Sequence, residues 1–196
     1  RPAFDASALE DAIAALSGPD SLLLLGGAAL TEDMLVIAGR IAAKTGCKLL
    51  SEWSNARLER GAGRVAIDRV PYPIDQALEA LKPYKRIVLI GARAPIGFFA
   101  YPGKPAILTA DGANIIDLCK TSQDIASALT AICDGTGATD TAPAHVAQSV
   151  TPDKPTGPLD PGGIADVLGR TIPEDAIVVD EAITTGRSFF PATAGA

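Results

Sequence analysis

Hydrophobic residues along roughly the first two thirds of the chain follow two alternating patterns, short apolar runs and longer stripes at helical spacing. Apolar runs bounded by Gly or Pro are typical of strands buried on both faces of a parallel sheet, and the stripes predict amphipathic helices. Strands are predicted at residues 21–25, 47–50, 65–67, 86–90 and 106–109, and helices near Ser7, Thr31, Pro73 and Asp124. Alternation at these lengths predicts an α/β fold, an open parallel sheet with helices on both faces in the Rossmann-like manner.

Several predicted helices carry recognisable start signals. Ser7 and Glu10 have the spacing of an S-x-x-E capping box. Thr31 can cap the helix that follows it, and a last helix is predicted to begin at Asp124. Residues 51–72 have no clear period and contain two glycines, so we interpret them as a long connection across the carboxyl edge of the sheet.

Composition changes at residue 134. Residues 134–161 hold repeated prolines among Gly, Thr and Asp, which indicates a linker after a central α/β domain at residues 1–133. In residues 162–196, a helix capped by Asp160 and beginning at Pro161 precedes an apolar run at residues 176–180, predicted to be a strand. One strand and one helix cannot bury a core. We therefore expect an incomplete second α/β unit, or one that completes itself on a partner.

Charge and composition narrow the classes of function. Apolar residues make up 47% of the chain and the net charge is −6, so no basic surface for nucleic acid is predicted. No apolar run approaches the ~20 residues of a membrane span. The sequence starts at Arg1, with neither Met nor a signal peptide, so we expect it to be part of a longer polypeptide. Three cysteines without a C-x-x-C spacing predict buried thiols in a reducing cytoplasm and no metal site.

Candidate binding residues follow the predicted strands. Gly26 and Gly27 resemble a phosphate-binding turn, although the full G-x-G-x-x-G pattern is missing, so a tight turn without a ligand is the competing interpretation. Arg93 follows the strand at 86–90 and could hold a phosphate or form an ion pair. The aromatic residues Phe98, Phe99 and Tyr101 could stack on a planar ligand or fill an interface. No catalytic residue is predicted, since the single histidine lies in the linker and no nucleophile motif occurs.

Two stretches carry a family resemblance. The first is LEALKPYKRIVLIGA at residues 78–92, continuing to the aromatic loop at 98–105, and the second is IPEDAIVVDE at residues 172–181, followed by Thr184-Thr185-Gly186. Together they resemble the acetolactate synthase-like and benzoylformate decarboxylase-like branch of thiamine diphosphate-dependent enzymes. The resemblance covers nearly the whole chain. It implies the Rossmann-like central domain of such an enzyme followed by the start of its diphosphate-binding domain.

The resemblance implies thiamine diphosphate and Mg²⁺ as cofactors of the complete enzyme, and carboligation or decarboxylation of 2-keto acids as its reaction. It places Glu181, Thr184, Thr185 and Gly186 beside the cofactor's diphosphate. The family's ylid-forming glutamate and its Gly-Asp-Gly metal motif are missing here, so the chain alone is expected to be structural and inactive, with no cofactor of its own. The implied partners are the missing N-terminal and C-terminal domains and further copies in a dimer or tetramer.

Flavin binding in the central domain is disfavoured. The FAD-binding branch usually has Arg-Phe-Asp-Asp after the strong strand, whereas Arg93 is followed here by Ala-Pro-Ile. Two alternatives remain open at this point: a stand-alone module that binds FAD, ADP or NAD at the sheet rim, and a structural domain that supports oligomerisation. The residues do not identify the 2-keto acid, nor do they decide between carboligase and decarboxylase.

Overall fold

The computed structural model describes residues 1–99, 101–182, 184–186 and 188–196. The chain forms two compact units. We call Arg1–Glu59 with Ile67–His145 the central unit, and Arg60–Ala66 with Val146–Ala196 the C-terminal unit. Residues 134–145, expected in the linker, thus fold with the central unit, and residues 60–66, expected in a loop of the central domain, fold with the C-terminal unit.

The central unit is built on a five-stranded parallel sheet. Its strands are β1 (Ser21–Leu25), β2 (Lys48–Ser51), β3 (Asp68–Arg69), β4 (Arg86–Ile90) and β5 (Asn114–Cys119). Their order is β3-β2-β1-β4-β5, and every neighbouring pair is parallel. This order places β1 and β4 side by side in the middle, where both faces of a sheet are covered. The predicted open parallel sheet is confirmed.

One face of the sheet is covered by α3 (Ile74–Leu81). Successive side chains of a strand point to opposite faces, so alternate residues of the central strands form a core with this helix. The residues of this core include Leu22, Leu24, Ile87 and Leu89 from the strands and Ala77 and Leu81 from the helix. All six are buried. The apolar stripe read from the sequence therefore faces the sheet as predicted.

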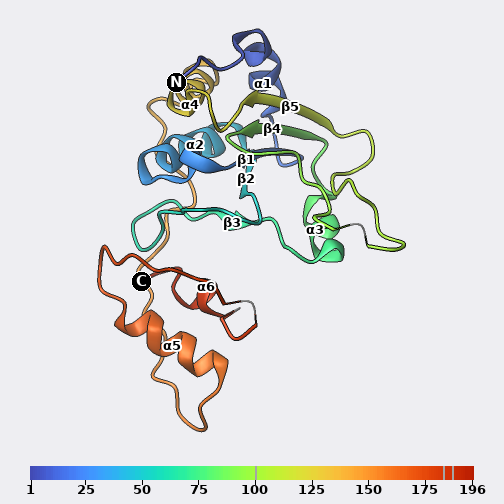
Figure 1. Ribbon diagram of the computed structural model, residues 1–196. Helices are drawn as coiled ribbons and strands as arrows, with labels where there is room; N and C mark the ends of the chain where they lie inside the picture. The colour runs from blue at the N-terminus through green and yellow to red at the C-terminus, as the bar shows by residue number, and fades with distance from the viewer. Residues whose placement is uncertain (100, 183, 187) are drawn as a thin grey trace. The chain divides into compact units, whose positions relative to one another are not determined.

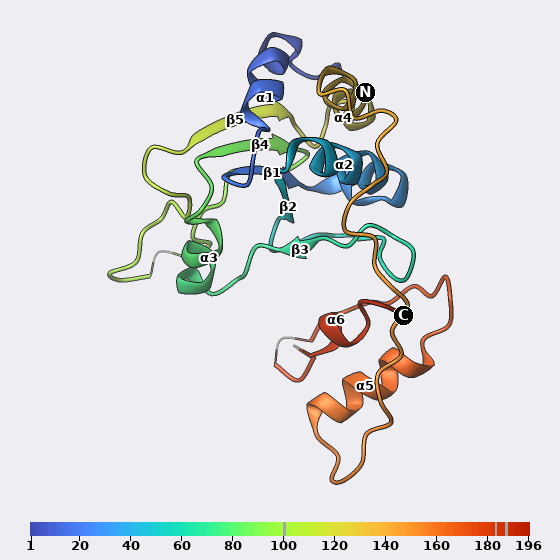
Figure 2. The ribbon, with the colours of Figure 1, turned by 180° about the vertical axis from the view of Figure 1, so that it is seen from behind.

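The opposite face is covered by α1 (Leu9–Ala15), α2 (Glu32–Thr45) and α4 (Ile125–Gly135). Figures 1 and 2 show these three helices on one side of the strands and α3 on the other. Leu23, Leu25, Val88 and Ile90, the alternate residues of β1 and β4, are fully buried beneath them. The prediction of helices on both faces is thereby confirmed.

The helix starts correct one prediction and bear out another. The capping box at Ser7 is wrong, because Asp5 accepts hydrogen bonds from the backbone N–H and hydroxyl of Ser7 and opens a 3-10 turn, η1 (Ala6–Ala8), before α1. The helix predicted to begin at Asp124 is α4, and the Asp124 carboxylate caps it by accepting from the Ser127 N–H at 3.1 Å. Thr31 occupies the N-cap position of α2, but its hydroxyl donates to the Ala28 carbonyl and does not cap the helix.

The strand predictions fail at the edges of the sheet. The predicted strand at 106–109 is wrong, since Ile107 forms only an isolated bridge with Ile96 and residues 114–119, which were not predicted, form the strand beside β4. Similarly, 65–67 is not a strand, and β3 follows it at Asp68–Arg69. Edge strands are half covered and need a weaker apolar pattern than central ones. In β5 only Leu118 and Cys119 are fully buried, and its Asp117 is exposed.

The C-terminal unit contains α5 (Pro161–Thr171) and α6 (Phe189–Ala192). Asp160 caps α5 as predicted, with its carboxylate accepting from the Gly163 N–H at 2.7 Å. The predicted strand at 176–180 is wrong: this run is irregular, and Ile177 is 94% exposed. Across the described ranges of the chain, the helices fall short of the length and hydropathy of a membrane span.

Candidate functional site

The carboxyl ends of three strands meet at one edge of the central unit, as expected for a parallel sheet. Backbone hydrogen bonds tie each end to its neighbour: Glu52 N–H donates to the Leu25 carbonyl at 3.1 Å, and Gly26 N–H donates to the Ile90 carbonyl at 3.0 Å. Gly91 then continues the row by donating to Cys119 at 2.6 Å. The residues that follow β1, β2 and β4 are thus close neighbours. This edge is where open α/β sheets bind ligands.

Arg93 lies at this edge, but its side chain is 92% exposed. Its backbone N–H donates to Glu52 Oε1 at 2.9 Å, and its Nε lies 3.8 Å from the same oxygen. The ion-pair interpretation of Arg93 therefore has a partner, Glu52, which directly follows β2. Gly27 has a φ of 54° and begins the 3-10 turn η2 (Gly27–Leu30). A phosphate-binding role for Gly26, Gly27 and Arg93 stays a prediction.

The aromatic residues of the loop after β4 join a larger cluster in the central unit. Trp53 contacts Tyr72 and Phe98 with ring centroids 5.0 and 5.4 Å apart, and Phe99 links Phe98 to Tyr101. A hydrogen bond with Tyr101 raises the pKa of Tyr72. All five rings are substantially exposed. Trp53 and Tyr72 were missed from sequence because they lie in the connection at 51–72, far from the others along the chain.

The proposed diphosphate loop lies in the C-terminal unit. Asp180 accepts a hydrogen bond from the Ala182 N–H at 3.0 Å, and Gly186 accepts one from the Phe189 N–H at 3.0 Å. A Cβ on Gly186 would overlap the Ala182 Cβ, so this turn is too tight for a larger residue. The side chains of Glu181, Thr184 and Thr185 are exposed. Ile183, between them, lies outside the described residues.

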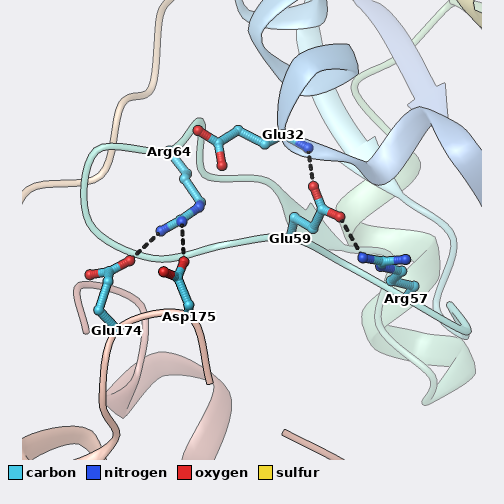
Figure 3. A network of polar contacts seen from close by, with 6 residues as sticks. All are labelled: Glu32, Arg57, Glu59, Arg64, Glu174 and Asp175. Atoms are coloured by element: carbon cyan, nitrogen blue, oxygen red, sulfur yellow. Dashed lines mark hydrogen bonds and ion pairs between the residues drawn. The ribbon is translucent and has the colours of Figure 1, made fainter. Parts of the chain in front are cut away.

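Two arginines of the segment 60–66 anchor the C-terminal unit. The Arg64 guanidinium donates to Glu174 at 3.0 Å and pairs with Asp175 at 3.5 Å (Figure 3). Arg60 lies over the Phe190 ring at 3.9 Å and donates to the Thr193 hydroxyl at 3.0 Å. The same segment forms backbone hydrogen bonds with residues 147 and 196. The C-terminal unit is therefore built from two stretches that are distant in sequence.

Figure 3 also shows a separate polar group in the central unit. Glu59 accepts a hydrogen bond from the Glu32 N–H at 2.6 Å, at the start of α2, and pairs with Arg57 at 3.0 Å. A carboxylate at a helix N-terminus is favoured by the helix dipole. We interpret Glu59 as a structural residue that fixes the connection leaving β2.

The three thiols are poor candidates for catalysis. Cys47, Cys119 and Cys133 are buried and free, as predicted. Burial, followed by the negative charges of Asp124 and Asp117, raises the pKa of Cys119 to about 11. A nucleophilic cysteine needs a lowered pKa, so this thiol is not activated. Within the part of the chain that the structure describes, no group of three or more His, Cys, Asp or Glu side chains could hold a metal ion.

Comparison with known proteins finds similarity to an acetolactate synthase-like protein. No protein-family model matches it. It is 42% identical over 180 residues to the Mycobacterium tuberculosis protein described as "Putative acetolactate synthase large subunit IlvX", a match that covers 92% of this chain and 34% of the relative. The chain thus spans about a third of that relative's length.

Solved structures agree in fold. A thiamine diphosphate-dependent 4-hydroxybenzoylformate decarboxylase of Rhodococcus jostii RHA1 matches 100% of this chain with 40% of its own, at a TM-score of 0.72 and 17% identity. Together, the sequence relative and the solved structures support the interpretation of this chain as part of a thiamine diphosphate-dependent enzyme. The family resemblance predicted from the sequence is confirmed. A second member, described as "a putative thiamin diphosphate-dependent enzyme" from Mycobacterium smegmatis, matches 89% of the chain at a TM-score of 0.62 and 18% identity.

The loop at 180–186 fits the family's cofactor in the chemistry of its donors. Phosphate oxygens readily accept hydrogen bonds from hydroxyl and backbone N–H groups. The loop offers the hydroxyls of Thr184 and Thr185 and the backbone N–H groups of a tight turn. The tight turn at Gly186 and the exposure of both threonines keep these donors accessible. A nucleotide at the rim of the central unit fits less well, because the Glu52 carboxylate already accepts the Arg93 N–H there.

Proposed function

We propose that this chain supplies the central domain and part of the cofactor-binding region of an acetolactate synthase-like enzyme that acts on 2-keto acids. The observation that carries the proposal is the 42% identity, over 92% of the chain, to a protein described as an acetolactate synthase large subunit. In this proposal the central unit is a structural support for the rest of the enzyme, since its central strands are buried in a packed core. The chain by itself is proposed to be inactive.

In this proposal, residues of the C-terminal unit hold the diphosphate. Thr184 donates its hydroxyl to a phosphate oxygen, Thr185 is the neighbouring donor, and Glu181 and Gly186 shape the turn that presents them. When bound, thiamine diphosphate supplies a carbanion that adds to the 2-keto carbonyl and a ring that accepts the electrons released on decarboxylation. Mg²⁺, its ligands and the activating glutamate are assigned to regions outside these 196 residues. We further propose that the complete enzyme is a dimer or tetramer and that it works in the reducing cytoplasm.

The experiment uses Thr184→Val in the longest natural polypeptide that carries this sequence. Valine keeps the shape of threonine but removes a hydrogen bond to a charged oxygen, worth about 1.5–3 kcal/mol. The dissociation constant for thiamine diphosphate, measured by calorimetric titration with Mg²⁺, should rise about ten- to a hundred-fold.

Thr171→Val is the matched control. The Thr171 hydroxyl donates within α5 to the Val167 carbonyl at 2.8 Å, so its loss should leave cofactor affinity unchanged. An unchanged dissociation constant for Thr184→Val would remove Thr184 from the site. Turnover of a 2-keto acid by the 196-residue chain alone, dependent on Mg²⁺ and thiamine diphosphate, would contradict the assignment of catalysis to other regions.

A further inference from the structure

In a sheet with this strand order, a nucleotide would bind at the carboxyl ends of β1 and β4, where the strand order reverses. The connection leaving β1 runs to α2 on one face, whereas α3, on the other face, leads into β4. Ligands of open α/β sheets bind at such a change of side, with phosphates against the backbone of glycine turns. Gly26 follows β1 and Gly91 follows β4. The crevice between these two turns is therefore the position to test.

Both glycines are required by the packing of the fold. A Cβ on Gly26 would collide with the Gly91 carbonyl oxygen, and one on Gly91, whose φ is 63°, would collide with the Gly26 carbonyl oxygen. The Gly91 Cβ would also lie 2.7 Å from Ile125 Cδ1 of α4. Glycine is required here because two backbone turns and a helix approach closely. The glycines thus need no ligand to explain them.

A carboxylate lies beside the first of these turns. Glu52 follows β2, and its side chain folds back so that Oε2 lies 2.6 Å from the position of a Gly26 Cβ. The other oxygen, Oε1, accepts the Arg93 N–H at 2.9 Å. The Glu52 side chain is only 18% exposed. The Glu52 carboxylate, which is largely shielded from water, therefore lies beside the turn at Gly26. It also accepts the Arg93 N–H, so this backbone donor after β4 is not free to bind a ligand.

We propose that Glu52 is a resident carboxylate that takes the place of a ligand anion, so that the central unit excludes diphosphate nucleotides such as FAD, ADP and NAD from this crevice. Two negative charges about 4 Å apart repel strongly where solvent is partly excluded. In dinucleotide-binding folds, however, an acidic residue after the second strand binds the ribose hydroxyls. The two roles predict opposite effects of removing the charge, which makes them separable.

The experiment titrates the 196-residue chain with ADP, FAD and inorganic pyrophosphate by calorimetry. The wild type is expected to show no saturable binding in the millimolar range. Glu52→Ala frees the Arg93 N–H and removes the charge, so pyrophosphate and ADP should gain about ten- to a hundred-fold in affinity. Glu52→Gln keeps the size and an acceptor for the Arg93 N–H but loses the charge, and should show a smaller gain.

Glu79→Gln is the control for net charge. Glu79 is 75% exposed on α3 and pairs with Lys82, so its substitution should leave binding as in the wild type. Saturable ADP binding by the wild type that weakens in Glu52→Gln would identify a ribose acceptor and overturn the proposal. Absence of any gain in Glu52→Gln, with an unchanged circular dichroism spectrum, would overturn it as well. Should Glu52→Ala fail to fold, Glu52→Gln decides alone.

Discussion

Two apolar runs of five residues, one in each unit, have opposite fates. Residues 21–25 form β1, and every residue of this strand is fully buried. Residues 176–180 are also mostly apolar, with Ile and Val in place of Leu, yet they are irregular, with Val179 79% exposed. The difference lies in the neighbours. β1 has parallel partners on both sides, β2 and β4, whereas residues 176–180 have no paired strand in the described part of the chain.

The comparison teaches that an apolar run does not form a strand by its composition alone. Backbone N–H and C=O groups need hydrogen-bond partners when they are buried, and a strand obtains these from adjacent strands. Helices satisfy their backbone groups internally, which explains why α5 forms in the same unit in which the strand does not. Sequence patterns therefore predict helices and central strands better than strands whose partners are missing.

The largest expected effect tests the comparison directly. Leu24→Ala removes a fully buried side chain from the core between β1 and α3, and should lower the free energy of unfolding of the central unit by about 3 kcal/mol. Ile177→Ala, at an exposed position of the other run, should change it by less than about 0.5 kcal/mol. Urea unfolding followed by the fluorescence of Trp53, the single tryptophan, reports on the central unit. Equal costs at both positions would contradict the structure.

A smaller effect compares the two aspartate caps, one in each unit. Asp124→Ala removes the cap of α4 and should lower the urea concentration at the midpoint of the Trp53 transition. Asp160→Ala removes the cap of α5 and should leave the Trp53 transition unchanged, while hydrogen exchange over residues 161–171 becomes faster. A shift of the Trp53 transition in Asp160→Ala would show that the two units unfold together.

The cap of α4 also has a pH dependence. A hydrogen bond from the Ser127 N–H, with another from its hydroxyl, lowers the pKa of Asp124 below its ordinary value. Its contribution to stability is therefore present above about pH 4, the unfolded value, and is lost as the pH falls through the folded-state pKa. The stability difference between wild type and Asp124→Ala should close in that range. Asp124→Asn, which caps without titrating, should keep its stability there, and a difference independent of pH would count against the cap.

The smallest effect concerns the segment that completes the C-terminal unit. Arg64→Ala breaks the pairs with Glu174 and Asp175, which directly precede the exposed run. Because both carboxylates are well exposed, the cost should not exceed about 1 kcal/mol, seen as faster hydrogen exchange in residues 161–171 and 189–196. Lys82→Ala, which breaks the well exposed pair with Glu79 at the end of α3, is the matched control. Exchange that stays the same in Arg64→Ala would show that the segment 60–66 does not stabilise this unit.

The sequence by itself determined the centre of the fold. Residues 21–25 and 86–90 were predicted as strands with the bounds that the structure has, because a continuous apolar run flanked by Gly or Pro has few other solutions. Asp160 was identified as a cap, and Asp124 as the start of a helix, because a local side chain satisfies a local backbone group at these positions. These features depend on residues that are neighbours in the chain. The family followed from two such stretches, at 78–105 and 172–186.

Only the tertiary structure decided the features that join distant residues. It placed β5 at 114–119 rather than a strand at 106–109, since an edge strand is selected by its fit to β4 and not by its own apolar pattern. It folded the Glu52 side chain over Gly26 and brought Trp53 and Tyr72 to the aromatic loop. It also assigned residues 60–66 to the C-terminal unit. Such contacts depend on the tertiary packing of residues that are distant in sequence, and a local pattern of residue types does not specify that packing.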